Sequence, residues 1–216
     1  MKAVFFDLDG TLTDPFPGIT RCIQHALRGI GAPQVPSASE LAWCIGPPLH
    51  ESLVRLVGRA QADSALTLYR ERFDAVGWRE NAVYEGIPDT LERLHRAGLA
   101  LYVATSKPRL YAERIVGHFG LAAYFRTIFG AELDGRNADK SDLLAVALAT
   151  SGARNAAMVG DRSHDMMGAR NNGLHPIGVS YGYGTPAELN GAGAAAIADS
   201  PRAIADLLLT PVPLAG

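Results

Sequence analysis

AVFFDLDGT (residues 3–11) joins a short apolar run directly to two aspartates. Residues 3–6 are rich in types that favour β-strands, and every one of them is apolar. A continuous apolar run of this length is typical of a strand that is buried on both faces, as in a parallel sheet. We therefore predict a buried parallel strand over 3–6 whose carboxyl end carries polar side chains.

We expect four further strands at 99–105, 126–130, 156–161 and 176–179, and helical patterns separate them. Strands that alternate with helices predict an α/β fold, here a Rossmann-like, doubly wound parallel sheet. In such sheets the functional groups gather beyond the carboxyl ends of the strands. The polar residues expected at that edge are Asp7, Asp9, Thr105, Ser106, Asp161 and Asp165.

Residues 15–82 interrupt this alternation. Apolar residues recur there at helical spacing from Ile19 to Ile30, and no segment reads convincingly as a strand. We predict a small all-helical domain at 15–82, inserted into a core made of residues 1–14 and 83–216. Hinges are expected near Asp14-Pro15 and within 83–86.

The bulk composition excludes several classes of protein. The chain has 216 residues, a formal net charge of −2 and two cysteines. No global positive field would recruit a nucleic acid polymer or an anionic membrane, and two cysteines cannot form a disulfide framework. The apolar run at the start is too short for a signal peptide or a membrane span, so we expect a cytoplasmic protein. Oligomeric state cannot be read from these features.

Asp7 and Asp9 are the first candidates for chemistry. Two carboxylates two residues apart in an extended chain point the same way, and like charges held together are unstable unless a proton or a cation intervenes. Mg²⁺ prefers such oxygen ligands and keeps room for substrate phosphate, and Asp161 could complete its site. Gly10 would free backbone N–H groups for phosphate oxygens. An isolated Asp-x-Asp is more often a capped strand end, but its place directly after an apolar strand favours the functional interpretation.

Hydroxyl and lysine side chains near the other strand ends could bind phosphate. Thr105 and Ser106 can donate to a phosphoryl oxygen, although Ser106 and Lys107 taken alone are more typical of a helix N-cap. Lys140 alone would be an ordinary surface lysine; in the functional interpretation it neutralises the nucleophile and the phosphoryl group. Asp165, four residues after Asp161, could equally cap a helix.

Taken in order, these segments resemble the haloacid dehalogenase superfamily of phosphatases. DLDGT at 7–11 is similar to the family's first motif, Thr105 to its second, Lys140 to its third and GDRSHD at 160–165 to its fourth. The resemblance implies Asp7 as nucleophile and Asp9 as general acid/base, with Mg²⁺ held by Asp7, the Asp9 backbone carbonyl and Asp161.

The same resemblance gives the remaining residues their roles. Thr105 and Lys140 would act on the phosphoryl group, Gly10 and Ser106 would bind phosphate, and Asp165 would support the metal. The insert at 15–82 resembles the family's helical cap, which closes over the site and selects the leaving group. The cap residues that could select substrate are Arg21, His25, Trp43, Gly46, His50 and Arg55.

Finer resemblance lies in residues 103–115, 129–135 and 180–194. These segments look like the bacterial branch that mixes phosphoglycolate phosphatases with nucleoside 5′-monophosphate phosphatases. The implied function is Mg²⁺-dependent hydrolysis of a small phosphate ester through an aspartyl-phosphate. A sugar phosphomutase of the same superfamily would use the same Asp7 and Asp9, and a non-catalytic binding protein on the same fold is a further alternative.

Overall fold

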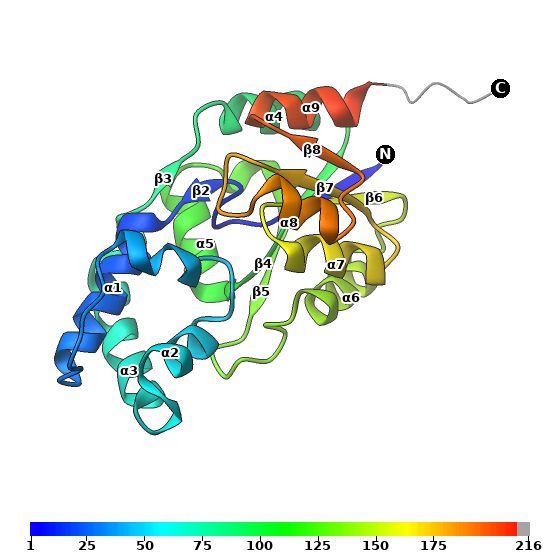
Figure 1. Ribbon diagram of the computed structural model, residues 1–216. Helices are drawn as coiled ribbons and strands as arrows, with labels where there is room; N and C mark the ends of the chain where they lie inside the picture. The colour runs from blue at the N-terminus through cyan, green and yellow to red at the C-terminus, as the bar shows by residue number, and fades with distance from the viewer. Residues whose placement is uncertain (211–216) are drawn as a thin grey trace. The chain divides into compact units, whose positions relative to one another are not determined.

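The computed structural model describes residues 1–210, so the last six residues of the predicted core lie outside it. The chain divides into two compact units. Unit 1 contains Met1–Leu12 and the chain from Val83 onward, and unit 2 contains Thr13–Ala82 (Figure 1). None of the helices within residues 1–210 is long and apolar enough to cross a membrane.

Unit 1 is built on a six-stranded sheet with the order β5-β4-β1-β6-β7-β8, in which every pair of neighbours is parallel. Its strands are β1 (Ala3–Phe6), β4 (Ala100–Pro108), β5 (Phe125–Ala131), β6 (Ala156–Gly160), β7 (His175–Val179) and β8 (Ala196–Ala198). The chain winds outward from β1 first toward β5 and then toward β8. This is the doubly wound arrangement that the alternating pattern predicts, and the α/β fold is confirmed.

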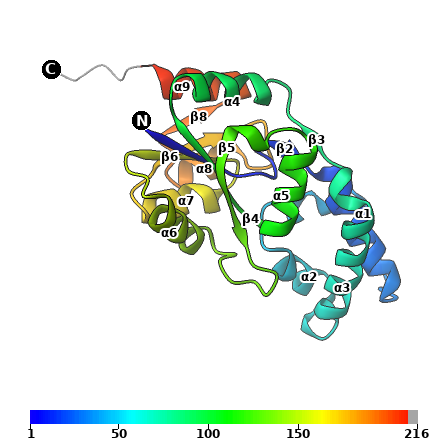
Figure 2. The same ribbon diagram turned by 180° about the vertical axis from the view of Figure 1, so that it is seen from behind.

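Helices connect these strands. They are α4 (Ile87–Arg96), α5 (Arg109–His118), α6 (Lys140–Ser151), α7 (Ser163–Asn171), α8 (Pro186–Gly191) and α9 (Pro201–Leu209), with a 3-10 turn at Ala122–Tyr124. Helices α4 and α9 lie side by side, as both views show (Figures 1 and 2). Helices α6 and α7 also pack together, and each contacts strands of the sheet.

The core of unit 1 lies on both faces of β1, because alternate residues of a strand point to opposite faces. Phe5 belongs to a buried cluster with residues of β4, β5, β6, α6 and α7, and its ring stacks on Tyr102 at 4.9 Å between centroids. Val4 and Phe6 face the other way and are equally buried. Burial of one such aromatic side chain stabilises the fold by about 1.5–3 kcal/mol, so β1 is firmly fixed at the point where Asp7 follows it.

Three features of unit 1 differ from the sequence-based expectation. Strand β8 and helix α8 were not predicted, since three residues at a sheet edge and one short helix carry little periodicity. Strand β4 continues to Pro108, beyond the expected end at Thr105. Its pairing with β5 shifts register between Thr105 and Pro108, and a Cβ at Gly130 would lie only 2.6 Å from Arg109 Cα, so glycine is required there.

Unit 2 is helical. It contains α1 (Phe16–Gly29), α2 (Leu49–Val57) and α3 (Arg59–Ala75), with 3-10 segments at Ser39–Cys44 and Gly77–Arg79. Helix α3 contacts both α1 and α2. Within the unit, the guanidinium of Arg72 donates two hydrogen bonds to the Glu80 carboxylate, at 2.7 and 3.1 Å. Strands β2 (Thr13–Asp14) and β3 (Ala82–Val83) form a separate two-stranded sheet.

Candidate active site

Polar side chains gather where β1, β4 and β6 end, because these strands are parallel neighbours in the sheet. Asp7 and Asp9 follow β1, Thr105 lies in the last part of β4, and Asp161 follows β6. Helices α6 and α7 contribute Lys140 and Asp165 from their first turns. All six are buried, with exposed fractions of 5% for Asp7, 8% for Asp9, 2% for Thr105, 4% for Lys140 and 1% each for Asp161 and Asp165.

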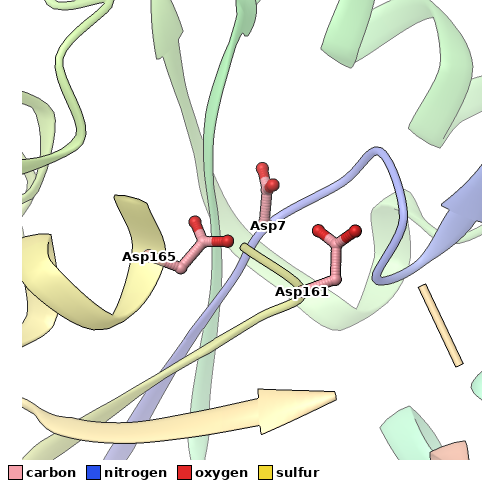
Figure 3. Close-up of side chains that lie close together, drawn as sticks. All are labelled: Asp7, Asp161 and Asp165. Carbon is pink, nitrogen blue, oxygen red and sulfur yellow. The ribbon is translucent and has the colours of Figure 1, made fainter. Parts of the chain in front are cut away.

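Asp7, Asp161 and Asp165 form a compact group of carboxylates. One carboxylate oxygen of each lies within 4.8 Å of the others. Figure 3 shows the three side chains converging from the end of β1, the loop after β6 and the start of α7. Three buried carboxylates at this separation repel one another strongly unless a proton or a cation lies among them. The group could therefore hold a metal ion.

Lys140 is the buried cation beside this group. Its Nζ lies 2.9 Å from Asp165 Oδ1 and 3.1 Å from Asp7 Oδ1, and it donates a hydrogen bond to the Ala104 carbonyl at 2.9 Å. Burial alone would lower the pKa of Lys140, but the charges of Asp165 and Asp7 outweigh it and raise the pKa above its ordinary value. Lys140 therefore stays protonated and is tethered to the carboxylates of Asp7, which follows β1, and Asp165, which lies in the first turn of α7.

Asp161 is held on one side only. Its Oδ2 accepts a hydrogen bond from the Tyr183 backbone N–H at 2.8 Å, whereas its Oδ1 is buried and has no hydrogen-bond partner among residues 1–210. Burial, followed by the charges of Asp165 and Asp7, raises the pKa of Asp161 well above its ordinary value. A buried acceptor of this kind is costly unless something binds it. Its position and chemistry fit a hard divalent cation, which prefers oxygen ligands.

Residues 180–184, Ser-Tyr-Gly-Tyr-Gly, form the loop that encloses Asp161. A Cβ at Gly182 would lie 2.6 Å from Asp161 Oδ2, and one at Gly184 would overlap the Asp161 carbonyl oxygen. The Tyr181 hydroxyl donates to the Thr11 carbonyl at 2.8 Å, and its pKa is raised, chiefly by burial, so it remains a neutral donor. The loop thus holds Asp161 by one backbone N–H, and it can approach Asp161 this closely because Gly182 and Gly184 have no side chains.

Asp165 has a partner on each oxygen. Lys140 Nζ lies 2.9 Å from Oδ1, and the Arg162 backbone N–H donates to Oδ2 at 3.1 Å. The second contact belongs to the N-terminal capping box of α7, so the expectation that Asp165 caps a helix describes part of its role. Burial is the largest influence on its pKa and, although Lys140 opposes it, the pKa is raised above its ordinary value.

Asp9 pairs with Lys107, which the sequence interpretation had treated as a helix cap. Lys107 Nζ donates to Asp9 Oδ2, and the exposed fractions of the two side chains are only 7% and 12%. Burial raises the pKa of Asp9 and the neighbouring Lys107 lowers it; the net direction is upward. The cap interpretation is wrong for Lys107, since the residue at the N-cap of α5 is Pro108 and the Lys107 ammonium binds Asp9 instead.

Carboxylates outnumber ammonium groups among the described residues of the site. Four buried carboxylates, those of Asp7, Asp9, Asp161 and Asp165, face the ammonium groups of Lys107 and Lys140. If all are ionised, the acids outnumber the bases by two charges. A divalent cation beside Asp161 Oδ1 would remove this excess, which is a second reason why these residues fit a metal ion.

The other predicted phosphate ligands have defined places. Gly10 has a φ of +83°, and a Cβ there would lie 2.6 Å from Asp161 Cγ, so only glycine allows the turn after β1 to approach the acidic group. Thr105 Oγ1 accepts the Lys107 backbone N–H at 3.2 Å. Ser106 donates its hydroxyl to the Ala138 carbonyl at 2.8 Å, so that bond must break before Ser106 can donate to a phosphate.

The substrate candidates of unit 2 have local partners. Arg21 lies 2.8 Å from Glu80, His50 lies 3.1 Å from Asp63, and the Arg55 guanidinium lies 4.2 Å from the Trp43 ring centre. His25 is exposed, and Gly46 is half-buried with a φ of +104°. Their selection of substrate stays a prediction.

Sequence reasoning missed Lys107 and the loop at 180–184. A signal for Lys107 was present, because Thr105 and Lys107 are two residues apart and share a face if the strand continues. The loop carried no such signal, since it acts through a backbone N–H and through glycines rather than through a reactive side chain.

The chain is matched by one family model. The family described as haloacid dehalogenase-like hydrolase matches residues 4–179, which include the ends of β1, β4 and β6 and the starts of α6 and α7. Among solved structures, a predicted phosphatase from Clostridium acetobutylicum superposes with a TM-score of 0.92 at 40% identity. That match covers 96% of this chain and 98% of the other.

Three of the curated relatives illustrate how their names differ. A 5′-nucleotidase of Pseudomonas aeruginosa is 46% identical over 190 residues, which cover 86% of each chain. The tyrosine-protein kinase PtkA of Mycobacterium tuberculosis is 44% identical over 185 residues, which are 85% of this chain but 63% of the kinase. A phosphoglycolate phosphatase of Pseudomonas fluorescens is 31% identical over 196 residues, covering 84% of this chain and 70% of the relative.

Proposed function

Because the chain belongs to the haloacid dehalogenase-like hydrolase family and is a phosphatase, we propose that it hydrolyses a nucleoside 5′-monophosphate or phosphoglycolate in a Mg²⁺-dependent reaction. Asp7 is the proposed nucleophile and Asp9 the proposed general acid/base. The observation that supports this most directly is the buried contact of Lys140 with Asp7 and Asp165, beside Asp161, whose Oδ1 has no hydrogen-bond partner within residues 1–210.

In the proposed first step, an Asp7 carboxylate oxygen attacks phosphorus as the bond from phosphorus to the leaving oxygen breaks. The leaving oxygen takes a proton from Asp9, and an aspartyl-phosphate remains on Asp7. In the second step Asp9 accepts a proton from water as the water oxygen attacks phosphorus, and Asp7 is released. Each carboxylate therefore returns to its starting state.

Lys140 supplies fixed positive charge in both steps. Its Nζ is 3.1 Å from Asp7 Oδ1 and lies in a site from which water is largely excluded, where such a charge is worth more than in solvent. Mg²⁺ held by Asp7, Asp161 and the Asp9 backbone carbonyl would neutralise charge on the phosphoryl oxygens. Thr105 and the backbone near Gly10 would position those oxygens.

The proposed substrate class rests on the relatives. The 5′-nucleotidase is more similar to this chain than the phosphoglycolate phosphatase is, at 46% against 31% identity, and it is matched over a larger share of its own length. We therefore rank nucleoside 5′-monophosphates above phosphoglycolate. Selection between them is proposed to come from unit 2, where Arg21, His50 and Arg55 are the first residues to test.

The test is a phosphate-release screen with purified protein and Mg²⁺. It compares nucleoside 5′-monophosphates, phosphoglycolate, sugar phosphates and pyrophosphate, each with and without a chelator. We expect hydrolysis that the chelator abolishes and added Mg²⁺ restores, with the highest kcat/KM on a nucleoside monophosphate. Metal-independent turnover would contradict the acidic site, and isomerised phosphosugar in place of free phosphate would show a mutase.

Asp7→Asn is the matching variant. Asn cannot form the acyl phosphate at the required rate, so we expect phosphate release to fall at least about 1,000-fold, by analogy with removal of other nucleophiles. Asp89→Asn is the control, because Asp89 is exposed on α4. Near wild-type activity of the Asp7 variant would refute the nucleophile assignment.

The kinase relative defines a rival outcome. Protein, ATP and a tyrosine-containing peptide copolymer would be incubated and assayed for phosphotyrosine. If phosphotyrosine forms and no phosphate ester is hydrolysed, the proposed function fails.

A further inference from the structure

The ion pair of Lys107 with Asp9 is a buried feature that neither the family's motifs nor the proposed chemistry explains. Lys107 Nζ donates to Asp9 Oδ2, and the two side chains are 7% and 12% exposed. Ordering and desolvating a lysine is costly, and a lysine is rarely buried unless it is paired. A chance ion pair on the protein surface would leave both side chains exposed. The burial of Lys107 and Asp9 therefore indicates that their contact has a structural or functional role.

The backbone around Lys107 is arranged to make this contact. β4 continues past Thr105 to Pro108, and its pairing with β5 shifts register in that stretch. The Lys107 N–H donates to Thr105 Oγ1 at 3.2 Å. A Cβ at Gly130 would lie 2.8 Å from the Lys107 carbonyl oxygen, so the neighbouring strand leaves room for this course only because it carries glycine there. Lys107 is therefore delivered to Asp9 by an irregularity of the sheet.

The contact makes the environments of the two carboxylate oxygens of Asp9 different. Oδ2 is held by Lys107, whereas Oδ1 is buried and has no hydrogen-bond partner in the described part of the chain. Lys140 has other partners, namely Asp7, Asp165 and the Ala104 carbonyl. Without Lys107, the Asp9 carboxyl could rotate about its side-chain bonds and present either oxygen in several directions.

We propose that Lys107 is a positioning residue that holds Asp9 by Oδ2 so that Oδ1 exchanges the proton with the leaving-group oxygen. This proposal rests on the proposed role of Asp9 as general acid/base. The proton passes from Asp9 Oδ1 to the leaving oxygen as the phosphorus–oxygen bond breaks and the bond from phosphorus to Asp7 forms. Orientation of this kind contributes to rate because a small misplacement of the acid weakens proton transfer.

The proposal predicts a dependence on the leaving group. An alkyl leaving group, such as the ribose 5′-oxygen of AMP, needs a proton as it departs, whereas p-nitrophenolate needs little help. For Lys107→Met we expect kcat/KM to fall about 100-fold or more on AMP, within the range that general acid catalysis contributes, and about tenfold or less on p-nitrophenyl phosphate. The ratio kcat/KM is the right measure because it reports the steps up to formation of the aspartyl-phosphate.

Two further variants separate this role from a structural one. Lys107→Arg keeps a donor to Asp9, so it should recover part of the loss on AMP. In an Asp9→Asn background, Lys107→Met should cause little additional loss, because a residue that acts through Asp9 has nothing left to position. Lys2→Met is the matched control, since Lys2 is exposed, and it should behave as wild type on both esters.

Several outcomes would overturn the proposal. An equal loss of kcat/KM on both esters would assign Lys107 to phosphate binding or to folding. A kcat/KM on AMP equal to that of wild type would show that Lys107 has no role in the reaction. Full additivity of the Asp9 and Lys107 variants would also overturn it. If Lys107→Met does not fold, the same ratio is measured on Lys107→Gln. A wild-type protein that hydrolyses neither ester would refute the proposed function itself and this inference with it, so the two failures are distinguishable.

Discussion

Gly182→Ala tests whether the loop at 180–184 sets the position of Asp161. A Cβ at this position would lie 2.6 Å from Asp161 Oδ2 and closer still to the Gly10 carbonyl oxygen. The Gly10 carbonyl belongs to the backbone, and the Asp161 side chain is buried, with only 1% exposed. Overpacking a buried site in this way costs about 1–3 kcal/mol. The part that yields most readily is the Asp161 carboxylate, whose Oδ2 is held by the Tyr183 N–H.

The expected effect falls on metal affinity. If Asp161 turns away to relieve the overlap, its carboxylate must return to bind the ion. The free energy of the overlap is then subtracted from the free energy of metal binding. Since each 1.4 kcal/mol is a factor of ten in binding, a cost of 1–3 kcal/mol predicts a Kd for Mg²⁺ that is about 5- to 150-fold weaker. The assay is calorimetric titration of the metal-free protein with Mg²⁺ in the absence of substrate, so that it does not depend on turnover.

Gly117→Ala is the control for this measurement. Gly117 lies exposed in α5, and no described atom lies within 4 Å of a Cβ there. We expect this variant to bind Mg²⁺ as wild type and to be more stable by about 0.5–1 kcal/mol, because alanine favours a helix. If Gly182→Ala also binds Mg²⁺ as wild type, the reasoning about Asp161 is refuted, whether or not the variant is destabilised in chelator.

Two other substitutions test the buried charges. Lys140→Met should lower the free energy of unfolding by about 3–5 kcal/mol in denaturant titrations, because Asp7 and Asp165 would lose the cation between them; the same stability as Lys2→Met would contradict this. In unit 2, the Arg72 hydrogen bonds hold the pKa of Glu80 below its ordinary value of 4.5. The stabilisation from these bonds is therefore fully present above pH 4.5 and is lost as the pH falls through the lowered pKa. Glu80→Gln should therefore cost about 1.5–3 kcal/mol at pH 7 and progressively less below pH 4.5; an equal cost at pH 7 and pH 3 would disprove the linkage.

Strand ends were predictable from the sequence, and side-chain pairings were not. The apolar runs before Asp7 and Asp161 identify buried parallel strands, and the topology of a doubly wound sheet then places both residues at one edge. This reasoning needs only residue type and order along the chain. It placed Lys140 near that edge only through the family resemblance, because a lysine at a helix start is ordinary in isolation.

The contact of Lys107 with Asp9 could not be predicted from the local sequence. That contact depends on the continuation of β4 beyond Thr105 to Pro108 and on the absence of a side chain at Gly130, which is on a different strand. A sequence read one segment at a time does not contain that coupling. The loop at 180–184 is a similar case, since Gly182 matters because of how closely it approaches Asp161 and Gly10, which lie far away in the sequence.

The roles of Asp161 and Asp165 can be separated by their contacts, although both belong to one carboxylate group. Both oxygens of Asp165 are engaged, by Lys140 at 2.9 Å and by the Arg162 N–H at 3.1 Å, so a metal ion would have to compete for them. Asp161 keeps Oδ1 without a described partner. We therefore propose Asp161 as the direct metal ligand and Asp165 as a residue that acts mainly by holding Lys140 and the start of α7.

It follows that Asp161→Asn should weaken Mg²⁺ binding more than Asp165→Asn does. Loss of a direct carboxylate ligand removes charge and a bond to the ion, whereas loss of a supporting partner typically costs about 10- to 100-fold in affinity. Asp165→Asn should also destabilise the metal-free protein, because Lys140 loses a buried counter-ion. Calorimetry and denaturant titration of the two variants would check both expectations. A larger loss of Mg²⁺ affinity in Asp165→Asn than in Asp161→Asn would reverse the assignment, and would make the contacts of Asp165 with Lys140 and Arg162 a state that the metal displaces.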